Sequence, residues 1–256
     1  MNRPETPKPG LVTPVMLKTE SDMAWPGDQP VFYMLSRDGL FLARDHPFFR
    51  SCVVARNWPA ELATQRQFLE LRCPKVPGEM LEEIIGFFSD VATLHGSEAV
   101  VVLLWDQLEQ RMRFEVPRQR AGVTEGWTGT LWPDDVKYDP PEVAPHLTPF
   151  GTIHSHVDGA AYASGIDVAD ESYFTGLHVV VGRIRQEPPE IVCTFVVDGV
   201  RFRVDPQNVL GTYAVRRTDT PREWIDRVEV KVKRYHGSGT YYEGEHDGGP
   251  ARGARR

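Results

Sequence analysis

The sequence predicts an α+β fold in which a mixed β-sheet is flanked by helices and preceded by a small β-rich unit. The clearest helical pattern, residues 77–94, runs directly into a strand-like apolar segment, Ala99–Trp105. Later strands come as a hairpin with an Asp-Gly turn, and one short helix at 168–174 lies among them. This order is typical of an α+β fold and differs from the regular strand–helix alternation of a doubly wound parallel sheet.

The N-terminal third predicts a lead-in followed by strands. Residues 1–30 are rich in proline and have little periodicity, so we expect an extended lead-in. Residues 31–44 alternate around a Ser-Arg-Asp-Gly turn signal and predict a β-hairpin. Further strands are expected at 50–55 and 67–73. We therefore predict a small β-rich unit over residues 31–75.

The helix at 77–94 is expected to cover the core. Pro77 suits the first turn, glutamates follow it near the positive end of the helix, and His95-Gly96 ends the pattern. Ala99–Trp105 is too short and too β-branched for a second helix, so we expect a central strand, paired with a strand at 111–116. The apolar side of the helix comprises Met80, Leu81, Ile84, Ile85, Phe87, Phe88, Val91 and Leu94.

Residues 117–149 contain six prolines and no periodic segment, which predicts a long loop. Long loops within domains often carry function. Trp127 and Trp132 lie in it, and either pack against the domain or form a surface that holds a substrate.

The remainder of the chain predicts more strands and then a tail. Strands are expected at 151–156 and 177–184, and a hairpin with an Asp-Gly turn at 191–204. Residues 216–235 are expected to be a C-terminal extension. Residues 236–256 are rich in glycine, have no large aliphatic side chains and predict a disordered tail.

Composition excludes several classes of function. Among 256 residues, 29 Lys and Arg oppose 36 Asp and Glu, and the net charge of −7 argues against nucleic acid as a partner. The longest apolar run is far shorter than a membrane span, and no apolar segment follows the first basic residue as in a secretory signal. The three cysteines are widely separated in apolar sequence, which predicts reduced, buried thiols. We therefore expect a cytoplasmic protein without membrane contact.

One short segment predicts chemistry. His154 and His156 are two residues apart in a predicted strand, so their imidazoles point to the same side, and Asp167 at the next helix can reach the same point. Two imidazoles and one carboxylate suit Zn²⁺, and three protein ligands leave a fourth position for water, as in catalytic zinc sites. By itself, the His-x-His spacing more often arises by accident in a surface strand.

The longer pattern is more specific. His154-Ser155-His156, followed by Ser164 and Asp167, resembles the motif of the JAMM (JAB1/MPN/Mov34) metalloproteases. The resemblance covers about residues 76–205. It implies an MPN/JAB-type domain over 76–215, with a mixed sheet flanked by helices in a sandwich similar to that of cytidine deaminases. It also implies one zinc ion per chain, held by His154, His156 and Asp167.

The resemblance further implies two catalytic residues. The family places a glutamate at the start of the strand that follows its first long helix, and Glu98 occupies that place. Glu98 would take a proton from water activated by zinc and deliver it to the leaving amine, while the Ser164 hydroxyl would hydrogen-bond the oxyanion. Other interpretations stay open: Ser164 as a helix N-cap only, and Glu98 as a solvated carboxylate. The alternative bases are Glu109, Glu115 and Glu125.

Two departures from the family pattern are visible. Val157 stands where most members have proline after the second histidine, which leaves the ligands intact but affects the rigidity of the loop. After Asp167, only about nine residues precede the next strand, too few for the loop with a second, structural zinc that some deubiquitinating relatives insert. We expect one zinc and a simpler cleft.

By resemblance, the function is zinc-dependent hydrolysis of a peptide or isopeptide bond after the C-terminal tail of a ubiquitin-like protein. The compact form looks like the prokaryotic branch of the family, which often occurs beside E1-like and E2-like enzymes, some of them in anti-phage defence operons. Expected partners are a ubiquitin-like protein or its conjugates, together with such enzymes. Two alternatives are a non-catalytic MPN-type scaffold that binds partners and a zinc hydrolase of small conjugates.

Overall fold

The computed structural model describes residues 13–60, 62–236 and 240–245, and the chain divides into two compact units between Phe68 and Leu69. Each unit is described by itself. The expected lead-in falls partly on residues 1–12, which lie outside the described residues.

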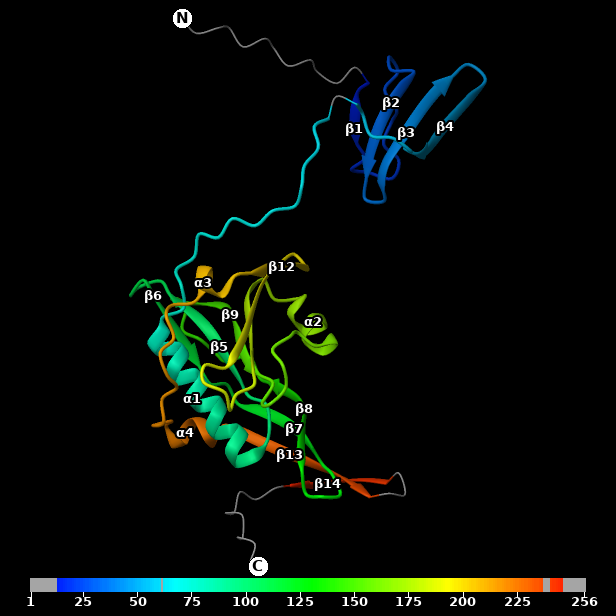
Figure 1. Cartoon of the computed structure of the whole chain (residues 1–256). Coiled ribbons are helices and arrows are strands. Elements are labelled where there is room, and N and C mark those ends of the chain that lie inside the picture. The colour runs from blue at the N-terminus through cyan, green and yellow to red at the C-terminus, as the bar shows by residue number, and fades with distance from the viewer. Residues whose placement is uncertain (1–12, 61, 237–239, 246–256) are drawn as a thin grey trace, which may run out of the picture. The chain divides into compact units, whose positions relative to one another are not determined.

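The first unit is a four-stranded sheet in the order β1-β2-β3-β4 (Figure 1). The strands are β1 (Val15–Leu17), β2 (Val31–Ser36), β3 (Gly39–His46) and β4 (Phe49–Val54). The antiparallel pairing of β2 with β3 confirms the predicted hairpin. Its core is small and consists of Phe32, Met34 and Ala43.

Three predictions for this region are wrong. Val15–Leu17, in the expected lead-in, pairs in parallel with β2, which a proline-rich context does not reveal. Residues 67–73 form no strand: their alternation is suitable, but no neighbouring strand pairs with them in the described structure. Cys52 on β4 is exposed, because β4 is an edge strand with little covering it, whereas Cys193 is buried as predicted.

The second unit contains a six-stranded mixed sheet in the order β12-β11-β10-β9-β5-β6. Its strands are β5 (Val100–Asp106), β6 (Arg111–Glu115), β9 (Leu147–Ser155), β10 (Gly176–Gly182), β11 (Glu190–Val197) and β12 (Val200–Val204). The helices are α1 (Gly78–His95), α2 (Gly165–Glu171), α3 (Pro206–Val209) and α4 (Arg222–Ile225). Within this sheet, β9 and β10 pair in parallel, and the other neighbouring strands pair antiparallel. Mixed sheets with few helices confirm the predicted α+β class.

Helix α1 forms where the sequence predicts it. Pro77 is its N-cap, and Gly96 ends it in the left-handed conformation, with φ of 64° and its N–H bonded to the Ala92 carbonyl. The predicted apolar side is buried except for Leu94, which is 54% exposed, and Met80, which is partly buried. No helix among the described residues is long and apolar enough to cross a membrane.

Both faces of the central sheet are covered, and the candidate site lies on the face opposite α1. Val101, Ile153 and Val179 are paired across β5, β9 and β10 and belong to the core packed against α1. Their neighbours along the strands, including His154, point to the opposite face. Figure 1 shows α1 and α2 on opposite sides of this sheet. His154 therefore points towards the α2 side.

A second sheet of the same unit corrects one prediction. It has the order β14-β13-β7-β8, formed by β7 (Gln119–Glu125), β8 (Leu131–Tyr138), β13 (Val228–His236) and β14 (Thr240–Glu245). The predicted loop at 117–149 thus contains two strands, and the expected C-terminal extension contributes α4 and β13. The prolines misled the prediction, because Pro133 lies in the edge strand β8, where a missing N–H is tolerated.

The disordered tail predicted at 236–256 is wrong in part. His236 ends β13, and residues 240–245 form β14, antiparallel to β13. Residues 237–239 and 246–256 lie outside the described residues. A glycine-rich segment without large aliphatic residues therefore still pairs as a strand, because backbone hydrogen bonds to β13 do not require large side chains.

Candidate metal centre

Three predicted ligands, His154, His156 and Asp167, meet at one point. His154 lies near the end of β9, His156 directly follows it, and Asp167 lies in the first turn of α2. The histidines are 6% and 8% exposed, and their Nε2 atoms are 3.2 Å apart. Asp167 Oδ1 is 3.5 Å from His154 Nε2, and Asp167 Oδ2 is 3.4 Å from His156 Nε2.

These separations fit a small tetrahedral cation. Zinc binds imidazole nitrogen and carboxylate oxygen at about 2.0–2.2 Å, so two ligands at neighbouring corners of a tetrahedron lie roughly 3.3–3.6 Å apart. The three measured separations between His154, His156 and Asp167 are 3.2 to 3.5 Å. The donor set is that of a zinc site with three protein ligands. The residues therefore fit a small tetrahedral cation such as zinc.

The strand geometry explains how the two imidazoles come together. Ser155, between them, points to the other side, is fully buried, and its hydroxyl accepts a hydrogen bond from the Ala99 N–H. His156 continues the ladder through its own N–H, which bonds to the Val181 carbonyl at 2.8 Å. Ser155 is structural, as its position in the strand predicts.

Asp167 is held by the start of its own helix. Ser164 is the N-cap of α2, and its Oγ accepts from the Asp167 N–H at 3.2 Å. The Ser164 N–H in turn donates to Asp167 Oδ2 at 2.6 Å, which completes a capping box. Ser164 is therefore the N-cap of α2. The capping box uses Ser164 Oγ only as an acceptor and does not use the hydroxyl proton, so a second role for that hydroxyl is compatible with capping.

The electrostatics of the cluster favour a cation. Burial would raise the pKa of Asp167, but hydrogen bonds from His154 and His156 outweigh it and hold the pKa well below its ordinary value of 3.8. Burial would lower the pKa of His156, but its hydrogen bond to Asp167 and the charges of Glu98 and Asp167 raise it. The charges that favour a proton on His156 also favour a metal ion at its Nε2.

Glu98 lies in the same cleft, in the segment 96–99 that joins α1 to β5. Burial raises its pKa above the ordinary value of 4.5, against the opposing charges of His156 and His154. A carboxyl group with a raised pKa is better suited to accept and return a proton near neutral pH. The three alternative bases Glu109, Glu115 and Glu125 instead pair with arginines and do not line the cleft in the described structure.

The cleft around this cluster has a volume of about 540 Å³. One wall is the segment Thr130–Val136 of the β7–β8 hairpin, and the cleft is also lined by the N-cap Ser164 and by Ile166 and Asp170 of α2. Trp132 lines the cleft and is 53% exposed, whereas Trp127 is 78% exposed and lies outside it. The sequence pointed to Trp132 as a possible substrate surface but predicted a loop here, because only the pairing of β8 with β7 makes the segment a strand.

Val157 has a conformation that proline cannot adopt. Its φ is +49°, while proline is restricted to about −65°, and it is only 4% exposed. Its carbonyl accepts a hydrogen bond from the Ile184 N–H at 2.7 Å. A β-branched residue at positive φ is strained, so the surrounding packing must hold this turn. The departure from proline thus goes with a different turn after the second histidine.

Comparison with known proteins adds a structural likeness. No protein-family model matches the sequence, and a search of curated proteins finds no match. Among solved structures, the chain is similar to a JAB1/MPN domain protein from Archaeoglobus fulgidus, at 17% sequence identity and a TM-score of 0.32. The match covers 55% of this chain and 99% of that protein.

Proposed function

We propose that the chain is a zinc-dependent peptidase or isopeptidase of the JAMM type, acting after the C-terminal tail of a ubiquitin-like protein. The observation that carries the proposal is the convergence of His154, His156 and Asp167 at tetrahedral separations in a cleft that also contains Glu98. A scaffold that only binds partners has no use for a buried ligand set of this kind beside a carboxyl group of raised pKa.

The residues of the cleft have separable tasks in this mechanism. His154, His156 and Asp167 would hold the metal, which when bound would supply Lewis acidity towards water and the scissile carbonyl. Glu98 would accept the proton of the attacking water and return it to the leaving amine. The Ser164 hydroxyl would donate a hydrogen bond to the oxygen that becomes negative at the reacting carbonyl.

The wall formed by β8 supports an extended substrate. In the described sheet, β8 pairs on one side only, with β7, so its other edge is available for backbone hydrogen bonds. A flexible peptide tail with small side chains can lie along such an edge, because it pairs through its backbone and needs no deep pocket. A ubiquitin-like tail has this character, and E1-like and E2-like enzymes of the same system are the further partners that we propose.

The test uses the full chain with ubiquitin-like fusion proteins from the same genome, assayed with and without a chelator. Cleavage directly after the ubiquitin-like tail, lost with the chelator and restored by zinc, is the expected result. Glu98→Gln is expected to keep zinc and lose most of kcat, because the amide keeps the shape but cannot accept the proton. Asp167→Asn is expected to lose zinc together with activity.

Each alternative has its own result in this experiment. Binding of the fusions without cleavage would indicate a scaffold, and cleavage of small amide conjugates but of no protein fusion would indicate a small-molecule hydrolase. Near-normal turnover of Glu98→Gln would eliminate Glu98 as the base. Unchanged turnover in both variants would refute the metalloprotease proposal.

A further inference from the structure

Helix α2 positions Asp167, yet it is poorly attached by apolar contacts. It has seven residues, too few to be stable as an isolated helix. Its larger apolar side chains face solvent, with Ile166 56% and Val168 40% exposed. Its one buried residue is Glu171, a carboxylate. Contacts other than a hydrophobic face must therefore hold α2 against the sheet.

The first of these contacts is an ion pair between Glu171 and Arg201 of β12. The side chains are 7% and 21% exposed, and Arg201 Nη1 donates to Glu171 Oε2. The other oxygen, Oε1, is buried and has no hydrogen-bond partner among the described residues; His178 Nδ1 is 3.9 Å from it. Removing one member of a buried pair leaves an uncompensated charge, so each charge strongly constrains the position of the other.

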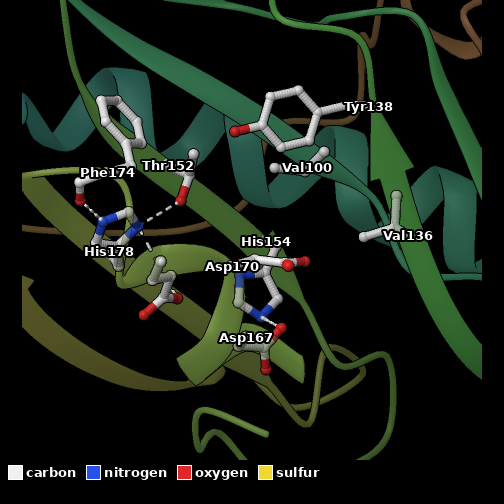
Figure 2. A pocket seen from close by; sticks show the side chains of 10 residues that line it. Val100, Val136, Tyr138, Thr152, His154, Asp167, Asp170, Phe174 and His178 are labelled. Atoms are coloured by element: carbon white, nitrogen blue, oxygen red, sulfur yellow. Dashed lines mark hydrogen bonds and ion pairs between the residues drawn. The ribbon is translucent and has the colours of Figure 1, made fainter. Parts of the chain in front are cut away.

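The second contact is made by His178 of β10 (Figure 2). Its Nε2 is 2.9 Å from the Phe174 carbonyl, which can only accept, so Nε2 carries a proton. Its Nδ1 is 2.9 Å from the Thr152 hydroxyl, two residues before His154 on β9. His178 thus connects the segment after α2 to the strand that carries the histidine ligands.

The helical spacing couples Glu171 to the ligand. Asp167 and Glu171 are four residues apart, so their side chains lie on the same face of α2, which Glu171 turns towards the sheet. Both side chains line a small cavity of about 90 Å³, together with His154 and His178. Fixing Glu171 at the sheet therefore fixes the rotation of the helix and the direction in which the Asp167 carboxylate points.

We propose that the Glu171–Arg201 ion pair is a positioning device that holds α2 so that Asp167 faces His154 and His156. The pair does not touch the metal position. It acts through the helix, in place of the hydrophobic packing that α2 lacks. The expected effect on metal binding rests on the proposed function, because it requires the metal site. The attachment of α2 by the ion pair does not depend on a metal.

The experiment compares full-length Glu171→Gln, Arg201→Met and the double variant with wild type. The zinc Kd is measured by competition with a chelator, and amide hydrogen exchange of residues 165–174 is measured without metal. Glu187→Gln is the control, because Glu187 forms an ion pair with Arg216 at 2.6 Å that does not involve α2, although its side chain is more exposed, at 36%, than that of Glu171.

We expect each single variant to raise the zinc Kd about tenfold or more, as loss of residues that orient ligands typically does, and the double variant to be no worse than either. Exchange over residues 165–174 is expected to accelerate at least about tenfold in the single variants. Glu187→Gln is expected to match wild type in both measurements, even where its Tm falls.

Wild-type zinc affinity and exchange in Glu171→Gln would overturn the proposal, and so would equal losses in Glu187→Gln, which would indicate general destabilisation. If wild type itself binds no zinc, the proposed function fails, and exchange over residues 165–174 still decides whether the ion pair holds α2.

Discussion

A methyl group added at Gly182 should disturb the metal centre from the strand next to it. Gly182 ends β10, and a Cβ built there would lie 2.3 Å from the Ala161 nitrogen and 2.6 Å from the Gly159 carbonyl oxygen. These are backbone atoms, so no flexible side chain can move aside. To reach an ordinary contact of 3.4 Å, the nearest of them must move about 1.1 Å.

The atoms that must move belong to the loop between His156 and α2. Gly159 donates to the His156 carbonyl at 2.8 Å, so a shift of the loop moves a ligand. Zinc sites tolerate deviations of roughly 0.2 Å in ligand distance, well below the required movement. Overpacking of this kind typically costs about 1–3 kcal/mol, which lowers Tm by about 2–12 °C in a unit of this size.

The assay for Gly182→Ala is thermal unfolding without metal and zinc Kd by chelator competition. We expect a lower Tm and a zinc Kd at least about tenfold higher than that of wild type. The control is Gly165→Ala, at the first position of α2, where a Cβ meets nothing within 4 Å. That change should keep or slightly raise Tm, because alanine restricts the unfolded chain. A wild-type Tm and zinc Kd in Gly182→Ala would refute the reasoning.

Four further predictions concern the same site. Burial raises the pKa of Glu98, so the contribution of this side chain to stability is fully present below the ordinary value of 4.5 and is lost as pH rises through the folded pKa. Glu98→Gln should therefore raise the Tm of the metal-free protein at pH 7 but not at pH 4. A rise in Tm at pH 4 but not at pH 7 would contradict this prediction. Zinc at 100 times its Kd should stabilise wild type by about 2.7 kcal/mol, raising Tm by about 5–11 °C, and a chelator should reverse this. Asp167→Asn should show no such shift; an equal shift there would place zinc elsewhere. Val157→Pro should cost more than about 1 kcal/mol in thermal or urea unfolding, because φ of +49° is closed to proline, and unchanged stability would refute that turn. Ser164→Ala should cost about 1 kcal/mol through loss of the N-cap, and an unchanged free energy of unfolding would show that the cap contributes nothing.

Local patterns in the sequence predicted the main helix and, together with the family resemblance, the three candidate ligands that the structure brings together. The strand period of two brings His154 and His156 to the same side. A serine before a helix is a natural N-cap, here of the helix that carries Asp167. Helix α1 was predictable because its apolar period, its proline and its final glycine agree with one another. All of these depend on residues within a few positions of each other along the chain.

The tertiary structure decided what depends on distant partners. Residues 119–125 become a strand because β13, about a hundred residues later, pairs with them in parallel, and no local period announces such pairing. β8 then pairs with β7 at the edge of the same sheet and forms the cleft wall. The family resemblance predicted Glu98 as the base, and the fold adds that Glu98, unlike Glu109, Glu115 and Glu125, lines the cleft with His156.

The attachment of α2 is the clearest case. As a sequence, Glu171 ends a short polar helix and looks solvated, since glutamate is rarely buried without a partner. Arg201, thirty residues later, supplies that partner only because β11 and β12 form a hairpin beside β10. The sequence by itself determined which residues can bind a metal; the folded sheet decided how they are held, because burial and charge pairing arise between segments that only the fold brings together.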